Sequence, residues 1–150
     1  MSPDQADFDS NLRSALDVVL RSSQVVCPPL IGLDRLPETT GVRVAFPLSG
    51  EPSLFFIFVL EPSLLDAMVA GMLGGPPAVD ELMRFRTSMG LEFANQVCGC
   101  LKRYLWPETR MGLPSLFAQE YPPPDSGNFF AAKTAHGTLA VGIYTRRNPG

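Results

Sequence analysis

The stretch SMGLEFANQVCGCLK, Ser88–Lys102, decides the fold, because it forms the middle of a long helical pattern from about Asp80 to Trp106. At about 100° per residue, the apolar side chains of this pattern gather on one side of the expected helix. They are Leu82, Met89, Phe93, Val97, Leu101 and Tyr104. A helix with one apolar side has to pack that side against a neighbouring element, so we expect a layered domain around it.

The opposite side of the same helix carries a narrow polar stripe of Ser88, Glu92, Asn95 and Gly99. Ser, Asn and Gly are poor helix formers and together forfeit about 2 kcal/mol relative to Ala. A purely solvated face would normally carry Glu, Lys, Arg or Gln. The stripe therefore suggests a functional surface, although an ordinary exposed face with mediocre helix propensity stays an alternative.

Length and composition indicate one globular domain over residues 1–150, and the order of the elements described below makes it an α/β domain. Residues 1–5 and 146–150 are expected to be frayed. The chain has 45% hydrophobic residues and a formal net charge of −3. This length suffices for a sizeable core. The mild acidic balance and the lack of a basic stripe with interleaved aromatics argue against a nucleic-acid partner.

The sequence offers no membrane segment. The N-terminus MSPDQADFD is polar and acidic, which is unlike a signal peptide. The longest apolar run, Leu54–Leu60, is too short to span a bilayer. We therefore expect a cytoplasmic protein with no membrane contact.

Cysteine and histidine usage predicts no metal site. Cys98 and Cys100 lie two residues apart on the expected helix, so their side chains diverge by about 200°. Cys27 is distant in sequence, and no CxxC pair occurs. His136 is the only histidine, which leaves no evident catalytic triad and no multi-histidine metal site.

The first part of the chain predicts a helix over Phe8–Val25, with Asp7 or Asp9 near its N-cap. The run Cys27-Pro28-Pro29 is expected to end this helix, and Leu30–Thr40 is expected to be a loop with further breakers.

A hairpin follows, with strands Gly41–Leu48 and Ser53–Leu60 joined by Ser-Gly-Glu-Pro. The second strand is almost continuously apolar, which is typical of a central strand that is covered on at least one face. Pro47 indicates that the first strand lies at an edge or ends there.

A second helix is expected to start at Glu61-Pro62-Ser63 and to stop at Gly74-Gly75-Pro76-Pro77. Its apolar residues follow helical spacing and are expected to be buried, with both methionines as core filler. They are Leu64, Leu65, Met68, Val69, Met72 and Leu73.

After the long helix, Ser115–Tyr121 is a candidate strand, and Asn128–Thr134 and Thr138–Thr145 predict a final hairpin. The order predicts a largely antiparallel sheet of about five to six strands packed with three helices. Because a small sheet has exposed edges, we also expect a homodimer formed through one edge.

The motif on the long helix resembles that of the CheX-like chemotaxis phosphatases, which are relatives of CheC and of FliY-type switch proteins. Their hallmark is Asp or Ser, three residues, Glu, two residues and Asn, which Ser88, Glu92 and Asn95 match, with Gly99 at a position where these proteins commonly have Gly. The segment GVRVAFPLSGEPSLFFIFVLEPSLLDAMVAGMLG, Gly41–Gly74, is also similar to theirs. The resemblance covers about Gly41 to Pro114 and implies a CheC-like fold.

The resemblance further implies the function. Similar proteins remove phosphate from the aspartyl phosphate of CheY, a receiver domain. By position, Asn95 would orient the attacking water, Glu92 would engage the receiver's active-site lysine, and Ser88 would contribute to partner binding. Gly99 would leave room for the partner. The receiver would supply Mg²⁺, so no cofactor is expected in this chain.

Two cations flank the same face. Arg84 and Lys102 could steer an acidic receiver to the site. They could equally be solubilising charges near the helix ends.

Two other functions remain open from the sequence. The same helix face could belong to a non-catalytic receiver-binding or flagellar switch-adaptor domain. The chain could also be a structural dimerisation domain without receiver contact.

Overall fold

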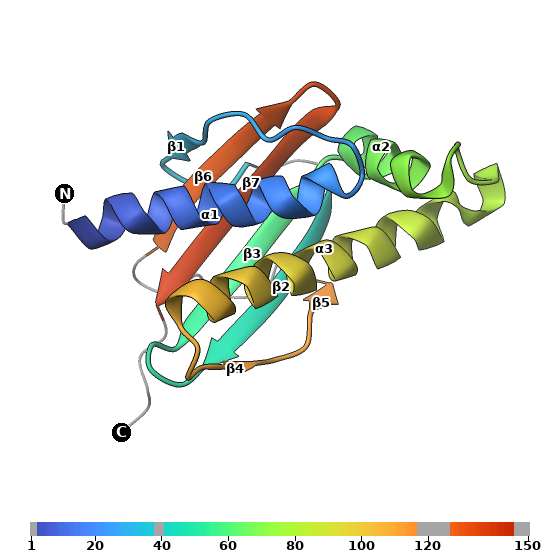
Figure 1. The fold of residues 1–150 in the computed structure, drawn as a ribbon. Coiled ribbons are helices and arrows are strands. Elements are labelled where there is room, and N and C mark those ends of the chain that lie inside the picture. The colour runs from blue at the N-terminus through green and yellow to red at the C-terminus, as the bar shows by residue number, and fades with distance from the viewer. Residues whose placement is uncertain (1–2, 38–40, 117–126, 146–150) are drawn as a thin grey trace.

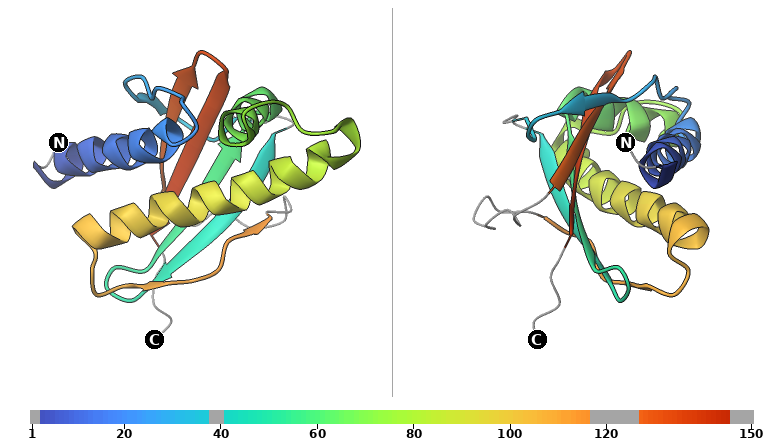
Figure 2. Two further views of the ribbon diagram at one scale, coloured as in Figure 1. Left: turned by 45° about the vertical axis from the view of Figure 1, so that its right-hand side comes forward. Right: turned by 90° about the vertical axis from the view of Figure 1, so that its left-hand side faces the viewer.

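Residues 3–37, 41–116 and 127–145 are described in the computed structural model. The elements follow the order α1, β1, β2, β3, α2, α3, β4, β5, β6 and β7, with a short 3-10 turn before α3. All three helices lie on one face of a single sheet (Figures 1 and 2). The expected α/β class, with three helices and an antiparallel sheet, is confirmed.

The sheet has the strand order β1-β6-β7-β3-β2-β4, and β5 also pairs with β2. It contains seven strands rather than five or six, because the short strands β1 (Ile31–Leu33) and β4 (Arg110–Met111) add to those expected. β1 lies in the segment expected to be a loop, so that expectation was wrong over three residues. Its pairing with β6 stabilises a strand that its own short sequence does not predict.

The central hairpin is confirmed, with β2 at Val42–Ser49 and β3 at Leu54–Leu60. β3 lies between β2 and β7, and all seven of its residues are buried. Among the described residues, the outer side of β2 pairs with the two-residue strands β4 and β5 (Ser115–Leu116). Pro47 therefore sits close to the edge, where its carbonyl accepts a 2.9 Å hydrogen bond from the Gly112 amide.

The first helix, α1, spans Pro3–Arg21, so both expected ends were wrong. It begins five residues before Phe8, which places Asp9 inside the helix rather than at its N-cap. Three residues after its last residue, Gln24 has a φ of 64°. The Val25 amide donates to the Leu20 carbonyl at 3.0 Å. A left-handed residue after a helix is normally Gly, so a Gln at this position gave no sign in the sequence that the helix ends here.

The helix α2 spans Pro62–Leu73 and ends on Gly74, whose φ of 78° is the left-handed conformation that Gly adopts readily. Its start and stop are as expected. Its buried residues are Leu64, Leu65, Met68 and Val69. Met72 and Leu73, also expected in the core, are 61% and 54% exposed, because the last turn of α2 projects with α3 beyond the sheet (Figure 1).

The long helix, α3, spans Leu82–Leu105 and crosses β2. Its buried residues are Gly90, Phe93, Ala94, Val97, Cys98 and Leu101. The Phe93 ring contacts the Phe58 ring edge-on, with 5.8 Å between the ring centroids. Tyr104, expected on the apolar side, is 69% exposed. Trp106 instead packs its ring against Phe8 and Phe56 at this end.

The final hairpin is confirmed as β6 (Gly127–Thr134) and β7 (Gly137–Thr145). Only Ser115–Leu116 of the expected strand Ser115–Tyr121 is observed, and its remainder lies outside the described residues. The expected frayed end, 146–150, also lies outside the described residues.

The edge of the sheet beside β6 is covered by β1, which pairs with β6 at Phe129–Ala131. Homodimerisation through a sheet edge stays a prediction.

The sheet is buried on both faces. The larger core lies between the sheet and the helices and contains Phe46, Phe56 and Phe58 with the apolar sides of all three helices. A smaller cluster on the other face includes Phe55, Ile57 and Tyr144. The main core fixes which side of α3 is buried and thereby which side is presented outward.

Candidate functional site

The polar stripe on α3 faces away from the core, as the sequence predicts. Ser88 and Glu92 are exposed, and Asn95 and Gly99 are half-buried. At about 100° per residue, the stripe lies roughly opposite the buried residues of the same helix. Glu92 and Asn95 are separated by about 4.5 Å along the axis. One helix therefore presents a carboxylate and an amide together.

Glu92 has a hydrogen-bond partner one turn further along α3. The Gln96 Nε2 group donates to Glu92 Oε1 at 2.9 Å. Both residues are exposed. The contact favours one orientation of the Glu92 side chain along the helix, at a stabilisation of about 0.2–0.5 kcal/mol.

Gly99 is less open than the sequence suggests. A Cβ atom added at this position would lie 3.8 Å from the terminal methyl group of Met111. Met111 comes from β4, on the segment that returns from α3 to the outer edge of β2. The structure thus adds Met111 to the end of the stripe, and no motif in the sequence signalled that contact.

The two flanking cations have local partners. Arg84 forms a 3.2 Å ion pair with Glu81 and lies 5.6 Å from the centroid of the Phe85 ring. Lys102 donates a 2.8 Å hydrogen bond to the Pro107 carbonyl just past the end of α3. They stand about 27 Å apart along the helix axis. These contacts favour helix-end roles, and any steering of a partner by these residues stays a prediction.

The end of α3 that carries Ser88 is tied to α2. Arg86 Nε contacts Asp66 Oδ1 at 2.6 Å, and Arg86 Nη2 contacts Asp66 Oδ2 at 2.7 Å. This hydrogen bond raises the pKa of the Arg86 guanidinium. Paired, charge-assisted bonds fix geometry as well as adding energy. The relative position of the two helices beside the stripe is therefore defined by more than apolar packing.

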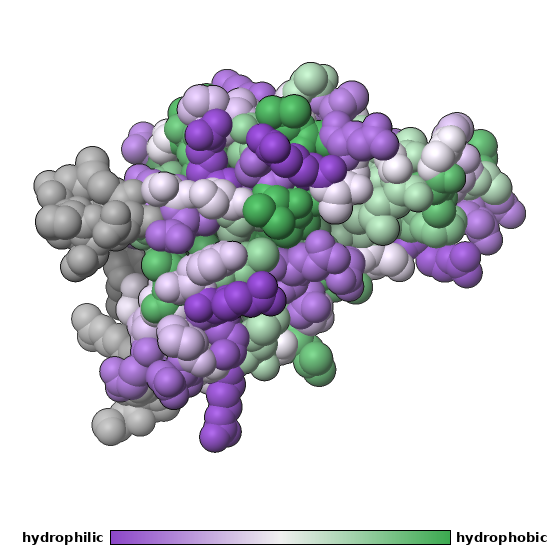
Figure 3. Space-filling view, viewed as in Figure 1, coloured by the Kyte–Doolittle hydropathy of each residue, from purple (hydrophilic) through white to green (hydrophobic). Residues whose placement is uncertain are grey.

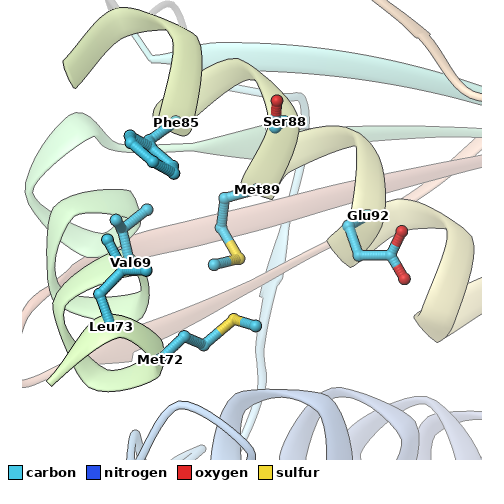
Figure 4. A pocket seen from close by; sticks show the side chains of 7 residues that line it. All are labelled: Val69, Met72, Leu73, Phe85, Ser88, Met89 and Glu92. Atoms are coloured by element: carbon cyan, nitrogen blue, oxygen red, sulfur yellow. The ribbon is translucent and has the colours of Figure 1, made fainter. Parts of the chain in front are cut away.

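An apolar groove lies next to the stripe, between α2 and α3 (Figure 4). Five apolar side chains line it: Val69, Met72 and Leu73 from α2, with Phe85 and Met89 from α3. Ser88 and Glu92 complete the lining. Helical spacing predicted that Met72 and Leu73 are core residues, so the sequence did not predict this groove.

Neither Cys27 nor Cys98 offers an activated nucleophile. Cys98 is buried, and burial raises the pKa of its thiol well above the usual value. Cys27 is buried as well, and its pKa is also raised, chiefly by burial. Within the described part of the chain, no three His, Cys, Asp or Glu side chains are grouped so that they could hold a metal ion. Among the helices described, none is both long and apolar enough to cross a membrane.

Comparison with solved structures places the fold among CheX- and CheC-like chemotaxis proteins. A CheC-like superfamily protein from Shewanella sp. PV-4 superposes with a TM-score of 0.73 at 18% identity, over 98% of this chain and 100% of that one. A chain of the CheX–CheY–BeF₃–Mg²⁺ complex from Borrelia burgdorferi gives 0.73 at 15% identity, over 92% and 97%. No protein-family model and no curated protein sequence matches.

A weaker structural similarity is to a domain of FliM. The middle domain of FliM from H. pylori superposes with a TM-score of 0.54 at 18% identity, over 97% of this chain and 93% of that one. At these identities the similarity establishes a CheC-like fold, which the resemblance in the sequence implies. Function has to be argued from the site itself.

Proposed function

We propose that this protein is a phosphatase that hydrolyses the aspartyl phosphate of a CheY-type receiver in chemotaxis or another two-component pathway. One observation carries the proposal: Glu92 and Asn95 lie together on the outward side of a 24-residue helix whose other side is anchored in the core. The CheC-like fold and the CheX–CheY complex among its structural neighbours support a receiver as the partner.

Asn95 would hold the attacking water. Its side-chain amide can donate to and accept from water, and it does not titrate near neutral pH. The water oxygen forms a bond to phosphorus as the bond from phosphorus to the aspartyl oxygen breaks. The products are the receiver's aspartate, inorganic phosphate and a proton. Positioning of water in line is the main requirement, because an acyl phosphate is already activated.

The carboxylate of Glu92 would accept a hydrogen bond from the ammonium group of the receiver's active-site lysine and pair with its charge. Pairing these charges orients the receiver on α3 and places its phosphate over Asn95. Ser88 would border the same contact. The receiver would bring its own Mg²⁺, which would neutralise charge on the phosphoryl group, and no residue of this chain is assigned to that ion.

The test is phosphate loss from purified CheY-type receivers of the same organism, after phosphorylation with acetyl phosphate. We expect faster loss with the wild-type protein and at least about 100-fold less acceleration with Asn95→Ala, because misplaced water reacts slowly. Asn128→Ala is the matched control, since Asn128 is an exposed asparagine in β6. Unchanged decay for every receiver at saturating protein would contradict the proposal.

A second candidate function is a non-catalytic receiver-binding or switch-adaptor domain that uses the same helix face. The similarity to the FliM middle domain favours it. It predicts that a phosphorylated receiver binds and keeps its normal phosphate lifetime. Substitution of Glu92 would then weaken binding, and substitution of Asn95 would have no effect on hydrolysis.

A further inference from the structure

The groove between α2 and α3 exposes apolar side chains that a folded domain usually buries. Met72 and Leu73 are both largely exposed. Val79 in the 3-10 turn before α3 and Met83 in the first turn of α3 are exposed as well. Hydrophobic colouring gathers over this projecting end, on the right of Figure 3. A contiguous exposed apolar patch commonly marks a binding surface. Methionine side chains also adapt to irregular partners.

The size of the groove restricts what it can hold. Its volume is about 200 Å³. Pockets for small molecules and cofactors usually measure about 300–1,000 Å³. The groove is therefore suited to one or two apolar side chains of a macromolecular partner.

The two helices that form the groove are held together. The ion pair between Asp66 and Arg86 joins α2 to α3, and Val69, which lines the groove, is buried. In Figure 4, Phe85 and Met89 from α3 face Val69, Met72 and Leu73 from α2. The two helices therefore need not be ordered relative to each other when a partner binds.

We propose that this groove receives an apolar side chain from the surface of the receiver that is bound at Glu92. The inference rests on the proposed function and adds a second, apolar anchor to it. Ser88 and Glu92 belong both to the groove lining and to the stripe. A receiver whose lysine reaches Glu92 would consequently lie beside the groove.

Charge around the groove agrees with this occupant. Arg84 is exposed and lies against the ring of Phe85, which lines the groove, and its ion pair with Glu81 would have to yield to or be shared with a partner. The active site of a receiver is acidic, so this cation would face opposite charge beside the apolar contact. A central apolar anchor with charged groups at its rim is the usual arrangement of energetically important contacts.

The test uses the full chain with ¹³C-methyl-labelled methionine and a CheY-type receiver activated with beryllofluoride and Mg²⁺. We expect the methyl signals of Met72 and Met89 to shift when the receiver is added. We also expect Met72→Gln to weaken receiver binding about tenfold, which corresponds to about 1.4 kcal/mol. With phosphorylated receiver, KM should rise by a similar factor and kcat should stay unchanged, since Met72 is not assigned to the reacting groups.

Val18→Gln is the matched control, because Val18 is an α1 residue with the same 61% exposure as Met72. Circular dichroism would verify that both variants fold. Binding of the receiver with unshifted Met72 and Met89 signals and an unchanged Kd for Met72→Gln would overturn this inference and leave the phosphatase proposal standing.

Two further outcomes would also overturn it. If the methionine signals shift with the concentration of this protein alone, a second copy occupies the groove. If no CheY-type receiver binds at all, the proposed function fails together with the inference. The binding measurement with wild-type protein distinguishes that result from failure of the groove alone.

Discussion

Gln96 donates a 2.9 Å hydrogen bond to the carboxylate of Glu92, one turn back along α3. The pair lies on the solvent-exposed side of a helix that is anchored by Phe93, Val97 and Leu101. The orientation of the carboxylate is consequently favoured before any partner arrives. The contact nevertheless competes with water, so its contribution has to be small.

Gln96→Ala is therefore expected to lower phosphatase activity by no more than about threefold, since an exposed pair of this kind contributes about 0.2–0.5 kcal/mol. Glu92→Gln should have a far larger effect, because it removes the charge that would pair with the receiver's lysine. The measurement is kcat/KM for phosphorylated receiver. Glu108→Gln, at an exposed position after α3, is the control. Equal losses for Gln96→Ala and Glu92→Gln would contradict this division of roles.

The two glycines of α3 are expected to respond to alanine in opposite directions. A Cβ atom at Gly90 would lie 3.0 Å from Val42 Cγ1 and 3.4 Å from Val44 Cγ2, where α3 packs on β2. Overpacking by Gly90→Ala should lower the free energy of unfolding by about 1–3 kcal/mol. The higher helix propensity of Ala would offset up to about 1 kcal/mol of this loss. Urea denaturation measures the change. A stabilised Gly90→Ala would show that the contact relaxes without cost.

At Gly99, a new Cβ atom would meet only the flexible end of Met111 at ordinary contact distance. Gly99→Ala should therefore stabilise the protein by up to about 1 kcal/mol through helix propensity. If Gly99 leaves room for the receiver, the same variant should bind the receiver more weakly. Unchanged receiver binding by the stabilised variant would leave Gly99 without a role in the interface.

Disruption of the Asp66–Arg86 pair should destabilise the α2–α3 end of the molecule. Both side chains are partly exposed, so Asp66→Asn should cost about 1 kcal/mol, which corresponds to a fall in Tm of about 2–4 °C. A double-mutant cycle with Arg86→Gln measures the coupling between the two residues. Additive effects of the two substitutions would show that the pair contributes nothing beyond its members.

Asp9 should make stability depend on pH in the acid range. One of its carboxylate oxygens is buried without a hydrogen-bond partner, and burial raises its pKa above the ordinary 3.8. The folded state therefore binds the proton of the Asp9 carboxyl group more tightly than the unfolded state does. The free energy of unfolding falls as the pH rises from 3.8 through the raised pKa, and the loss persists at neutral pH.

Asp9→Asn is accordingly expected to stabilise the protein at pH 7, by less than about 1 kcal/mol because the carboxyl is only partly buried. The gain should vanish below pH 3.8, where Asp9 is protonated in both states. Thermal unfolding of both proteins between pH 3 and pH 7 is the measurement. A gain that is independent of pH would assign the effect to helix propensity instead of charge.

Periodicity predicted the elements that bury one continuous side. The β2–β3 hairpin, the start and stop of α2 and the outward stripe of α3 could all be predicted, because alternation, capping residues and helical spacing are written locally. The class of the fold followed from the order of those elements. The motif of Ser88, Glu92 and Asn95 was visible for the same reason, since all three lie on one helix.

The tertiary structure alone decided what covers each side. Met72 and Leu73 have the spacing of core residues, yet they are exposed because no described strand covers the last turn of α2. β1 is a strand only because β6 lies beside it. Met111 approaches Gly99 because β4 pairs with the outer edge of β2. Sequence spacing determines which way a side chain points, and only packing between distant segments determines what it meets there.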